Sequence, residues 1–187
     1  VHERRWERIR FTGIQMKGKV LGVVGLGRIG SEVVRLLTGF EMRILAHDPF
    51  VSPDRARRLG VELTDLDTLC RESDFITIHA PLTKQNQGLI GAREFGLMKR
   101  GVRIINCARG GIIDEAALYD AIKEGIVAGA ALDVFSKEPP FDNPLLGLPQ
   151  VVATPHLGAS TYEAQINVAV EVADAIVDAL HGRPVRN

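Results

Sequence analysis

The chain of 187 residues has few of the features that mark several large classes of protein. Its two cysteines, Cys70 and Cys107, lack the spacing of a metal motif, so we expect no metal site and a reducing, cytoplasmic setting. It contains no apolar run of about 18 residues, the length that spans a bilayer, and no secretory leader pattern. Its formal net charge is zero, so neither a nucleic acid nor a membrane surface is an expected partner.

The most informative segment that is present is Gly25-Leu-Gly-Arg-Ile-Gly30. A short apolar run, residues 19–24, precedes it as a buried parallel strand would. Apolar residues at helical spacing follow the glycines, and Asp48 ends a second apolar run that covers residues 42–46. This order of strand, glycines, helix, strand and acid is the fingerprint of a dinucleotide-binding site.

Each part of this fingerprint has a mechanical reason, and together the parts predict NAD as a cofactor. Gly25 permits the tight turn, Gly27 lets backbone N–H groups approach a pyrophosphate, and Gly30 lets helix and strand pack closely. The helix N-terminus would face the phosphates with its free N–H groups. Asp48 would accept hydrogen bonds from the adenosine ribose, and its charge would repel a 2′-phosphate. The alternative is a glycine turn in a domain that binds nothing.

Strands and helices alternate along the rest of the chain, without internal repeats. The further expected strands cover residues 61–63, 75–79, 102–106, 128–134 and 151–153. The expected helices cover residues 53–59, 65–72 and 93–98, and a further segment that begins at Asp114. Glu138-Pro-Pro140 should end regular structure. This alternation predicts an α/β fold, a doubly wound parallel sheet of the Rossmann type that is covered on both faces.

A long helix is expected to end the chain. Ser160 begins a capping box with Glu163, which marks the start of this helix. Its apolar residues repeat at i, i+3 and i+4, which predicts one buried face. These residues are Ile166, Ala169, Val170, Ala173, Ile176, Val177 and Leu180.

The first residues, by contrast, read as the end of a helix that comes from elsewhere. Four arginines lie within residues 1–10, but Glu3 and Glu7 are interspersed with them. This mixed charge is typical of a solvated helix face or a subunit contact rather than a nucleic-acid site. Trp6 and Phe11 indicate that part of this arm is covered.

Several candidate site residues follow strands of the predicted parallel sheet. Ligands gather beyond the carboxyl ends of such strands, so we expect these residues to line one edge. They are Gly25, Asp48, His79, Ala108, Arg109, Asp133 and His156.

Two residues in the loop after residue 106 have side chains capable of chemistry. The guanidinium of Arg109, placed in a loop of small residues, suits bidentate recognition of a carboxylate. It could equally form a structural ion pair or touch the cofactor. Cys107 is interpreted as a packed thiol rather than a nucleophile, because free cysteine behaves mainly as a small buried hydrophobe.

His156 follows the last strand, on the half of the sheet where a nicotinamide should lie. A carboxylate bonded to it, such as that of Glu138, would fix its tautomer and make it an acid–base group. The alternative is an ordinary loop histidine. His79 could be a core or cofactor-wall histidine and His47 lies on the adenosine side, whereas Asp133 could reach the nicotinamide carboxamide or cap a turn.

Four segments together resemble the D-isomer-specific 2-hydroxyacid dehydrogenases, in order and over nearly the whole chain. They are Gly25–Gly30, Asn106–Asp114, Ala131–Pro140 and Pro155–Thr161. The resemblance implies that Arg109 binds the substrate carboxylate, that His156 donates and accepts the proton, and that Glu138 is the partner of this histidine.

The resemblance also implies a set of residues that contact NAD. Ala80 stands where a threonine is common in the family, so a hydroxyl contact is absent there. The set is Gly25, Gly27, Arg28, Ile29, Gly30, Asp48, Pro49, Ala80, Pro81, Cys107, Ala108, Arg109, Asp133, His156, Gly158 and Ala159.

Members of this family carry a second domain, so the resemblance implies an isolated nucleotide-binding domain. Residues 1–18 would be the incoming helix and arm with a subunit contact, and residues 19–160 the dinucleotide-binding core. Residues 161–187 would form the helix that leads to the absent substrate domain. A homodimer or a higher homo-oligomer is the expected assembly.

The substrate implied is a small D-2-hydroxy acid. Within the family, Gly158-Ala-Ser-Thr-Tyr-Glu-Ala-Gln165 is most like the branch that oxidises 3-phosphoglycerate. Glycerate, glyoxylate and lactate are alternative substrates. An NAD-sensing corepressor-like module, which resembles the same family, is the alternative from another functional class.

Overall fold

The structure of this chain, a computed structural model, describes residues 6, 9 and 12–185. The incoming helix expected near the start, and Phe11 with it, lie outside the described residues. Trp6 is described, and 77% of its surface is exposed. None of the residues that the structure describes therefore covers most of its ring.

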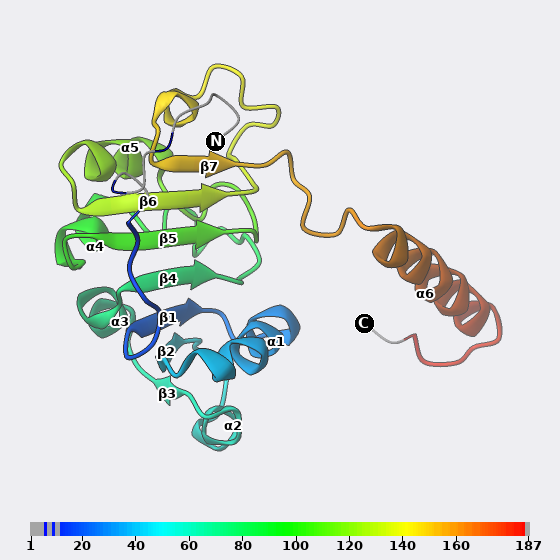
Figure 1. The fold of residues 1–187 in the computed structure, drawn as a ribbon. Helices are drawn as coiled ribbons and strands as arrows, with labels where there is room; N and C mark the ends of the chain where they lie inside the picture. Colours follow the sequence, from blue (N-terminus) through cyan, green and yellow to red (C-terminus); the bar gives the residue numbers. More distant parts are fainter. Residues whose placement is uncertain (1–5, 7–8, 10–11, 186–187) are drawn as a thin grey trace.

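Seven parallel strands form one sheet in the order β3-β2-β1-β4-β5-β6-β7 (Figure 1). They are Val20–Val24 (β1), Arg43–His47 (β2), Glu62–Leu63 (β3), Phe75–Ile78 (β4), Val102–Asn106 (β5), Val127–Leu132 (β6) and Val151–Ala153 (β7). The chain builds outward from β1 to β3 and then returns to place β4 on the other side of β1. The strand order reverses there, at the point where parallel sheets of this kind bind ligands. The predicted doubly wound parallel sheet is confirmed.

The helices largely follow the predicted positions. They are Arg28–Leu37 (α1), Pro53–Leu59 (α2), Leu66–Glu72 (α3), Ala92–Leu97 (α4), Glu115–Lys123 (α5) and Tyr162–Leu180 (α6). Two of the predicted caps are confirmed. A carboxylate oxygen of Asp65 accepts the N–H of Thr68 at 2.8 Å, and one of Asp114 accepts the N–H groups of Ala116 and Ala117.

The core lies in two clusters because residues alternate between the faces of each strand. In β1, Leu21 and Val23 join the cluster that contains Val34 of α1. Val24 belongs to the other cluster, with Leu69 of α3. Burying each such side chain contributes about 1.5–3 kcal/mol. The two clusters hold the strand ends, and thus the site, in fixed positions.

One local prediction is wrong by one residue, and a second is confirmed. The helix N-cap is Thr161, whose extended backbone (φ −112°, ψ 156°) brings its hydroxyl to the N–H of Ala164. Ser160 lies one residue too early to make this contact. The prediction that Glu138-Pro-Pro140 ends regular structure is confirmed, since the next element is a 3₁₀ turn, Pro144–Gly147 (η3), where a first-turn proline loses no hydrogen bond.

The predicted burial of the last helix is also wrong for this chain. Helix α6 stands away from the sheet in Figure 1 and contributes no buried residue. The spacing of apolar residues in α6 predicts an apolar face, but it does not identify the surface that packs against that face. Val152 of β7 is likewise 65% exposed, so the sheet is not covered on both faces across its whole width. Within the described chain, no helix has the length and apolarity needed to cross a membrane.

Candidate functional site

The carboxyl edge of the sheet gathers the residues that were predicted to line it. Gly25, Asp48, His79, Asp133 and the loop at 107–109 each follow the end of a strand. An open pocket of about 240 Å³ lies on this edge near the switch point between β1 and β4. Its lining residues are Ile29, His79, Ala80, Pro81, Cys107, Ala108 and Arg109.

The glycine-rich loop after β1 has the geometry that a phosphate-binding turn requires. Gly25 adopts a φ of +94°, and a Cβ on Gly30 would come within 2.0 Å of the Gly25 carbonyl oxygen. A Cβ on Gly27, by contrast, would meet nothing within 4 Å, so the space above the loop is open. Helix α1 begins at Arg28 with no side-chain cap and no acid in its first turn. Its first N–H groups are therefore available to an anion.

Asp48 is joined directly to this loop. Its Oδ2 accepts the N–H of Leu26 at 2.7 Å, and its Oδ1 accepts the N–H of Phe50 at 2.8 Å. Above the same turn, the guanidinium of Arg55 in α2 donates to the Leu26 carbonyl at 3.2 Å. Each carboxylate oxygen of Asp48 keeps lone pairs for a further donor. Pro49 is exposed at the same turn.

The loop after β5 is shaped by a buried amide. The side chain of Asn106 accepts the N–H of Ala108 and donates to the Arg109 carbonyl, both at 3.0 Å. Arg109 is exposed, and its guanidinium donates to the Ala108 carbonyl at 2.6 Å. In the described part of the chain it forms no ion pair, so the structural ion pair considered above is not observed.

Cys107 in this loop corrects one prediction. Its side chain is exposed rather than packed in the core. Partial burial and the nearby charge of Asp133 nevertheless raise the pKa of the Cys107 thiol. A raised pKa disfavours the thiolate, which is the nucleophilic form. The exposure thus adds no support for a nucleophilic role.

His156 and Glu138 form the most distinctive pair of the site. Nδ1 of His156 lies 2.9 Å from Oε2 of Glu138, while Oε1 accepts the N–H of Phe135 at 3.1 Å. The bonds from His156 and then Phe135 hold the pKa of Glu138 below its usual range. An ionised carboxylate only accepts hydrogen bonds, so we assign the proton to Nδ1 and leave Nε2 as a free acceptor in the neutral ring.

Asp133 holds the turn that carries His156. The carboxylate is buried and accepts the hydroxyl of Thr154 at 2.5 Å and the N–H groups of Leu157 and Gly158 at 2.7 and 2.8 Å. Burial raises its pKa, but these three bonds outweigh burial and leave the pKa lowered. The structure therefore shows the turn-capping role, and a contact of Asp133 with a carboxamide stays a prediction.

The turn gives His156 an unusual backbone. Its φ is +55°, in the left-handed region that few residues other than glycine adopt. Its N–H donates to the Asp133 carbonyl at 3.0 Å. Further along, the carbonyl of Ala159 accepts the side-chain amide of Gln165 at 3.1 Å. The surrounding bonds thus fix a conformation that aims the imidazole at Glu138.

The two other histidines of the edge are held by local contacts. Nε2 of His79 lies 2.9 Å from the hydroxyl of Thr77, and burial lowers the pKa of His79. This half-buried side chain also lines the pocket, and its role as a cofactor-wall residue stays a prediction. Nδ1 of His47 donates to the carbonyl of Thr64 at 3.2 Å on the β2–β3 side of the sheet.

Sequence reasoning missed the residues that support the site from outside it. Asn106 ends a strand before a run of small residues, a signal that could have been used. Arg55 and Glu115 carry no such signal, because their partners are distant in the sequence. Leu26 lies 29 positions from Arg55, and Ser136 lies 21 positions from Glu115. Among the residues that the structure describes, no three His, Cys, Asp or Glu side chains come together as a metal site.

Comparisons with known proteins place this geometry in context. Residues 1–158 match the family described as D-isomer specific 2-hydroxyacid dehydrogenase, NAD binding domain. The chain is 57% identical to the D-3-phosphoglycerate dehydrogenase of Archaeoglobus fulgidus and 50% identical to that of Bacillus subtilis. These alignments cover 100% and 99% of this chain but only 36% and 35% of the relatives. The chain thus spans about a third of the length of the curated relatives it matches.

Solved structures show the same similarity in three dimensions. The apo D-lactate dehydrogenase of Escherichia coli matches with a TM-score of 0.88 and 36% identity, over 100% of this chain and 59% of that one. The holo D-mandelate dehydrogenase of Rhodotorula graminis matches with a TM-score of 0.88 and 33% identity, over 95% of this chain and 53% of that one.

Proposed function

Because this chain belongs to the D-isomer specific 2-hydroxyacid dehydrogenase family, we propose that it is the NAD-binding part of an enzyme that oxidises 3-phosphoglycerate to 3-phosphohydroxypyruvate. The observation that carries the proposal is the contact of 2.9 Å between His156 and Glu138 on the sheet edge that also holds the glycine-rich loop. The names of the relatives at 50–57% identity support 3-phosphoglycerate as the substrate and serine biosynthesis as the context.

The residues present fit NAD. The open space above Gly27 and the free N–H groups at the start of α1 suit the pyrophosphate. Residues 28–29 would lie beside it, with Asp48 and Pro49 at the adenosine. Ala80 and Pro81 would line the wall of the cofactor site. Cys107, Ala108, Arg109, Asp133, His156, Gly158 and Ala159 would surround the nicotinamide. When bound, NAD supplies the acceptor for the hydride that leaves C2 of the substrate.

His156 would act as the acid–base group. Its Nε2 atom, free because Nδ1 is bonded to Glu138, would take the proton of the substrate hydroxyl. The adjacent carboxylate of Glu138 would stabilise the imidazolium that forms. In the reverse direction the same imidazolium would return the proton to the carbonyl oxygen.

Arg109 would hold the substrate. Its exposed guanidinium sits at the pocket and forms no ion pair within the described chain. It can therefore offer two parallel N–H donors to the substrate carboxylate, a geometry that lysine does not reproduce. This contact would orient C2 toward the nicotinamide and stabilise charge on the substrate oxygen.

The setting and assembly are part of the proposal. Cys70 and Cys107 are both free thiols, which supports a reducing, cytoplasmic compartment. The exposed Trp6 and Ile9 support a homodimer contact in residues 1–18. Residues 19–160 would form the cofactor-binding core, and α6 would lead from it toward a substrate domain.

A substrate panel tests the proposed activity. A full-length protein that carries this domain should form NADH with 3-phosphoglycerate more efficiently than with glycerate or lactate. This chain alone should bind NAD with little turnover, because it spans only about a third of the length of the relatives named as dehydrogenases and closure of a site around the substrate commonly completes the catalytic residues. If the full-length protein binds NAD but oxidises no 2-hydroxy acid, the proposed function is wrong.

A further inference from the structure

The loop that carries Glu138, residues 136–143, is held to the rest of the domain by very few contacts. Most of its residues are exposed. Within the described chain, its hydrogen bonds to the adjoining residues Phe135, Leu145 and Leu146 are local. Those that reach more distant parts of the domain run to His156 and to Glu115 of α5. The second partner plays no part in the chemistry proposed above.

Glu115 accepts hydrogen bonds from loop residues on both sides of Glu138. Its Oε1 accepts the N–H and the hydroxyl of Ser136, both at 2.6 Å. Its Oε2 accepts the side-chain amide of Asn143, also at 2.6 Å. Short bonds of this kind to a carboxylate are about twice as strong as bonds between neutral groups. Asn143 is itself fixed, because its oxygen caps the N–H of Leu145.

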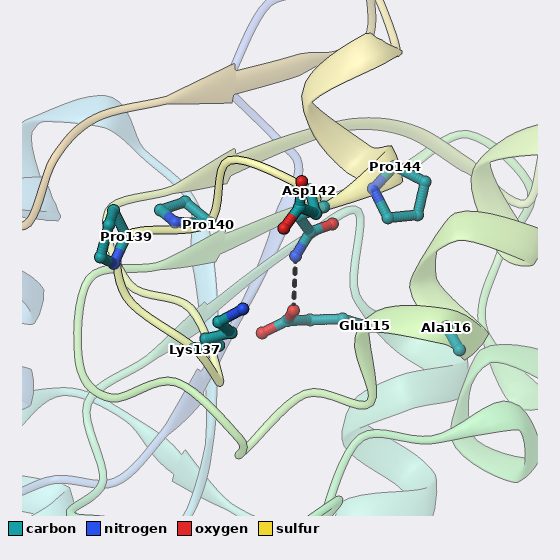
Figure 2. A pocket seen from close by; sticks show the side chains of 8 residues that line it. Glu115, Ala116, Lys137, Pro139, Pro140, Asp142 and Pro144 are labelled. Carbon is teal, nitrogen blue, oxygen red and sulfur yellow. Dashed lines mark hydrogen bonds between the residues drawn. The ribbon is translucent and has the colours of Figure 1, made fainter.

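Apolar packing does little to hold the loop at this place. An open pocket of about 260 Å³ lies between the loop and the start of α5. Figure 2 shows its lining, with the bond that the Asn143 amide donates to Glu115 as a dashed line. The prolines of the loop and Lys137 stand around the hollow without filling it. The carboxylate of Glu115 is therefore the main link across this gap.

We propose that Glu115 is a positioning residue, which ties residues 136–143 to α5 and so keeps Glu138 bonded to Nδ1 of His156. The inference deepens the proposed function, because the acid–base chemistry rests on this pair. Glu115 is not among the residues that line the pocket on the carboxyl edge of the sheet. It acts through Ser136 and Asn143 alone.

The tautomer of neutral His156 in this chain provides the test. Long-range ¹H–¹⁵N NMR spectra distinguish a proton on Nδ1 from one on Nε2. The unchanged chain should show the Nδ1–H form. In Glu115→Ala the ratio of Nδ1–H to Nε2–H should fall about tenfold, since a bond to a charged partner is weakened. Glu115→Gln should give a smaller fall, because its amide oxygen can still accept from Ser136.

Asp114→Ala is the matched control. It removes the N-cap of the same helix, whose N–H partners are Ala116 and Ala117, and leaves the contacts of Glu115 in place. Its tautomer ratio should stay that of the unchanged chain. If Glu115→Ala leaves the ratio unchanged, or if Asp114→Ala lowers it equally, the positioning role is wrong. Ser136→Ala, which removes one donor only, decides the question if Glu115→Ala does not fold.

The kinetic readout separates this inference from the proposed function. In a full-length protein, Glu115→Ala should lower kcat with 3-phosphoglycerate and leave NAD binding unchanged. If the full-length protein oxidises no 2-hydroxy acid but Glu115→Ala still lowers the ratio of Nδ1–H to Nε2–H at His156, the proposed function is wrong and the positioning role stands. If the full-length protein oxidises 3-phosphoglycerate but Glu115→Ala leaves the tautomer ratio of His156 unchanged, the proposed function stands and the positioning role is wrong.

Discussion

The backbone N–H of Leu26 donates to Oδ2 of Asp48 at 2.7 Å, so the glycine-rich loop after β1 is joined to the carboxylate that follows β2. One side chain therefore does two things. It fixes the position of the loop, and it presents its remaining lone pairs at the place where the ribose of NAD would lie. A change at Asp48 should alter both the loop and the ribose site.

Asp48→Ala should weaken NAD binding by this chain about tenfold or more. The estimate follows from the loss of hydrogen bonds to a charged group, each worth about 1.5–3 kcal/mol. Isothermal titration calorimetry with NAD measures the change directly. Asp54→Ala removes the same charge from α2, where Asp54 pairs with Arg57, and should bind NAD as the unchanged chain does. Equal affinities for all three proteins would refute the ribose assignment.

Asp48→Asn should show how much the charge of Asp48, as distinct from its shape, determines the choice between NAD and NADP. The amide oxygen can still accept one hydrogen bond, but the charge that repels a 2′-phosphate is gone. The ratio of the Kd values for NADP and NAD should therefore fall, and Arg55 nearby would favour the added phosphate. A ratio equal to that of the unchanged chain would show that Asp48 does not determine cofactor choice.

His156→Ala in a full-length protein should lower kcat by about 10²–10⁴-fold, the range typical of a lost general acid–base group. NAD affinity should change little, because the glycine-rich loop and Asp48 are untouched. The measurement combines steady-state NADH formation with NAD titration of the same variant. Turnover close to that of the unchanged protein would exclude His156 as the proton acceptor.

Most of the fold could be predicted because local signals agree with topology. Short apolar runs between turn residues marked the strands, and parallel strands bring their carboxyl ends to one edge. The positions of Gly25 and His156 at that edge follow directly. Contacts between distant residues could not be predicted, since the bonds of Glu115 to Ser136 and Asn143 depend on how α5 meets a loop. The apolar spacing of α6 likewise does not identify the surface against which this helix packs.

Cys107 should react slowly with iodoacetamide although it is exposed. Partial burial and the charge of Asp133 raise its pKa, so less thiolate is present at neutral pH than in free cysteine. Alkylation followed by mass spectrometry should give a rate severalfold below that of a free thiol. Burial raises the pKa of Cys70 to about 12, so Cys70 should react only after unfolding. Alkylation of Cys107 faster than free cysteine would contradict the assigned thiol form.

Asp133 should make stability depend on pH. Burial raises its pKa, but the bonds from Thr154, Leu157 and Gly158 leave the folded-state pKa below the unfolded value. A lowered folded-state pKa contributes stability above the unfolded value, and that contribution is lost as the pH falls through the folded pKa. Asp133→Asn keeps the size of the side chain but turns an amide toward one of its N–H donors.

The free energy of unfolding of the unchanged chain should therefore exceed that of Asp133→Asn at neutral pH. The gap should narrow as the pH falls below about 4, the ordinary range of aspartate. Urea unfolding at several pH values measures the gap, and taking the difference between two proteins cancels the other carboxylates. Because the same bonds orient the turn of His156, the variant should also lose kcat in a full-length protein. A gap that stays constant with pH would show that the Asp133 carboxylate does not carry this stability.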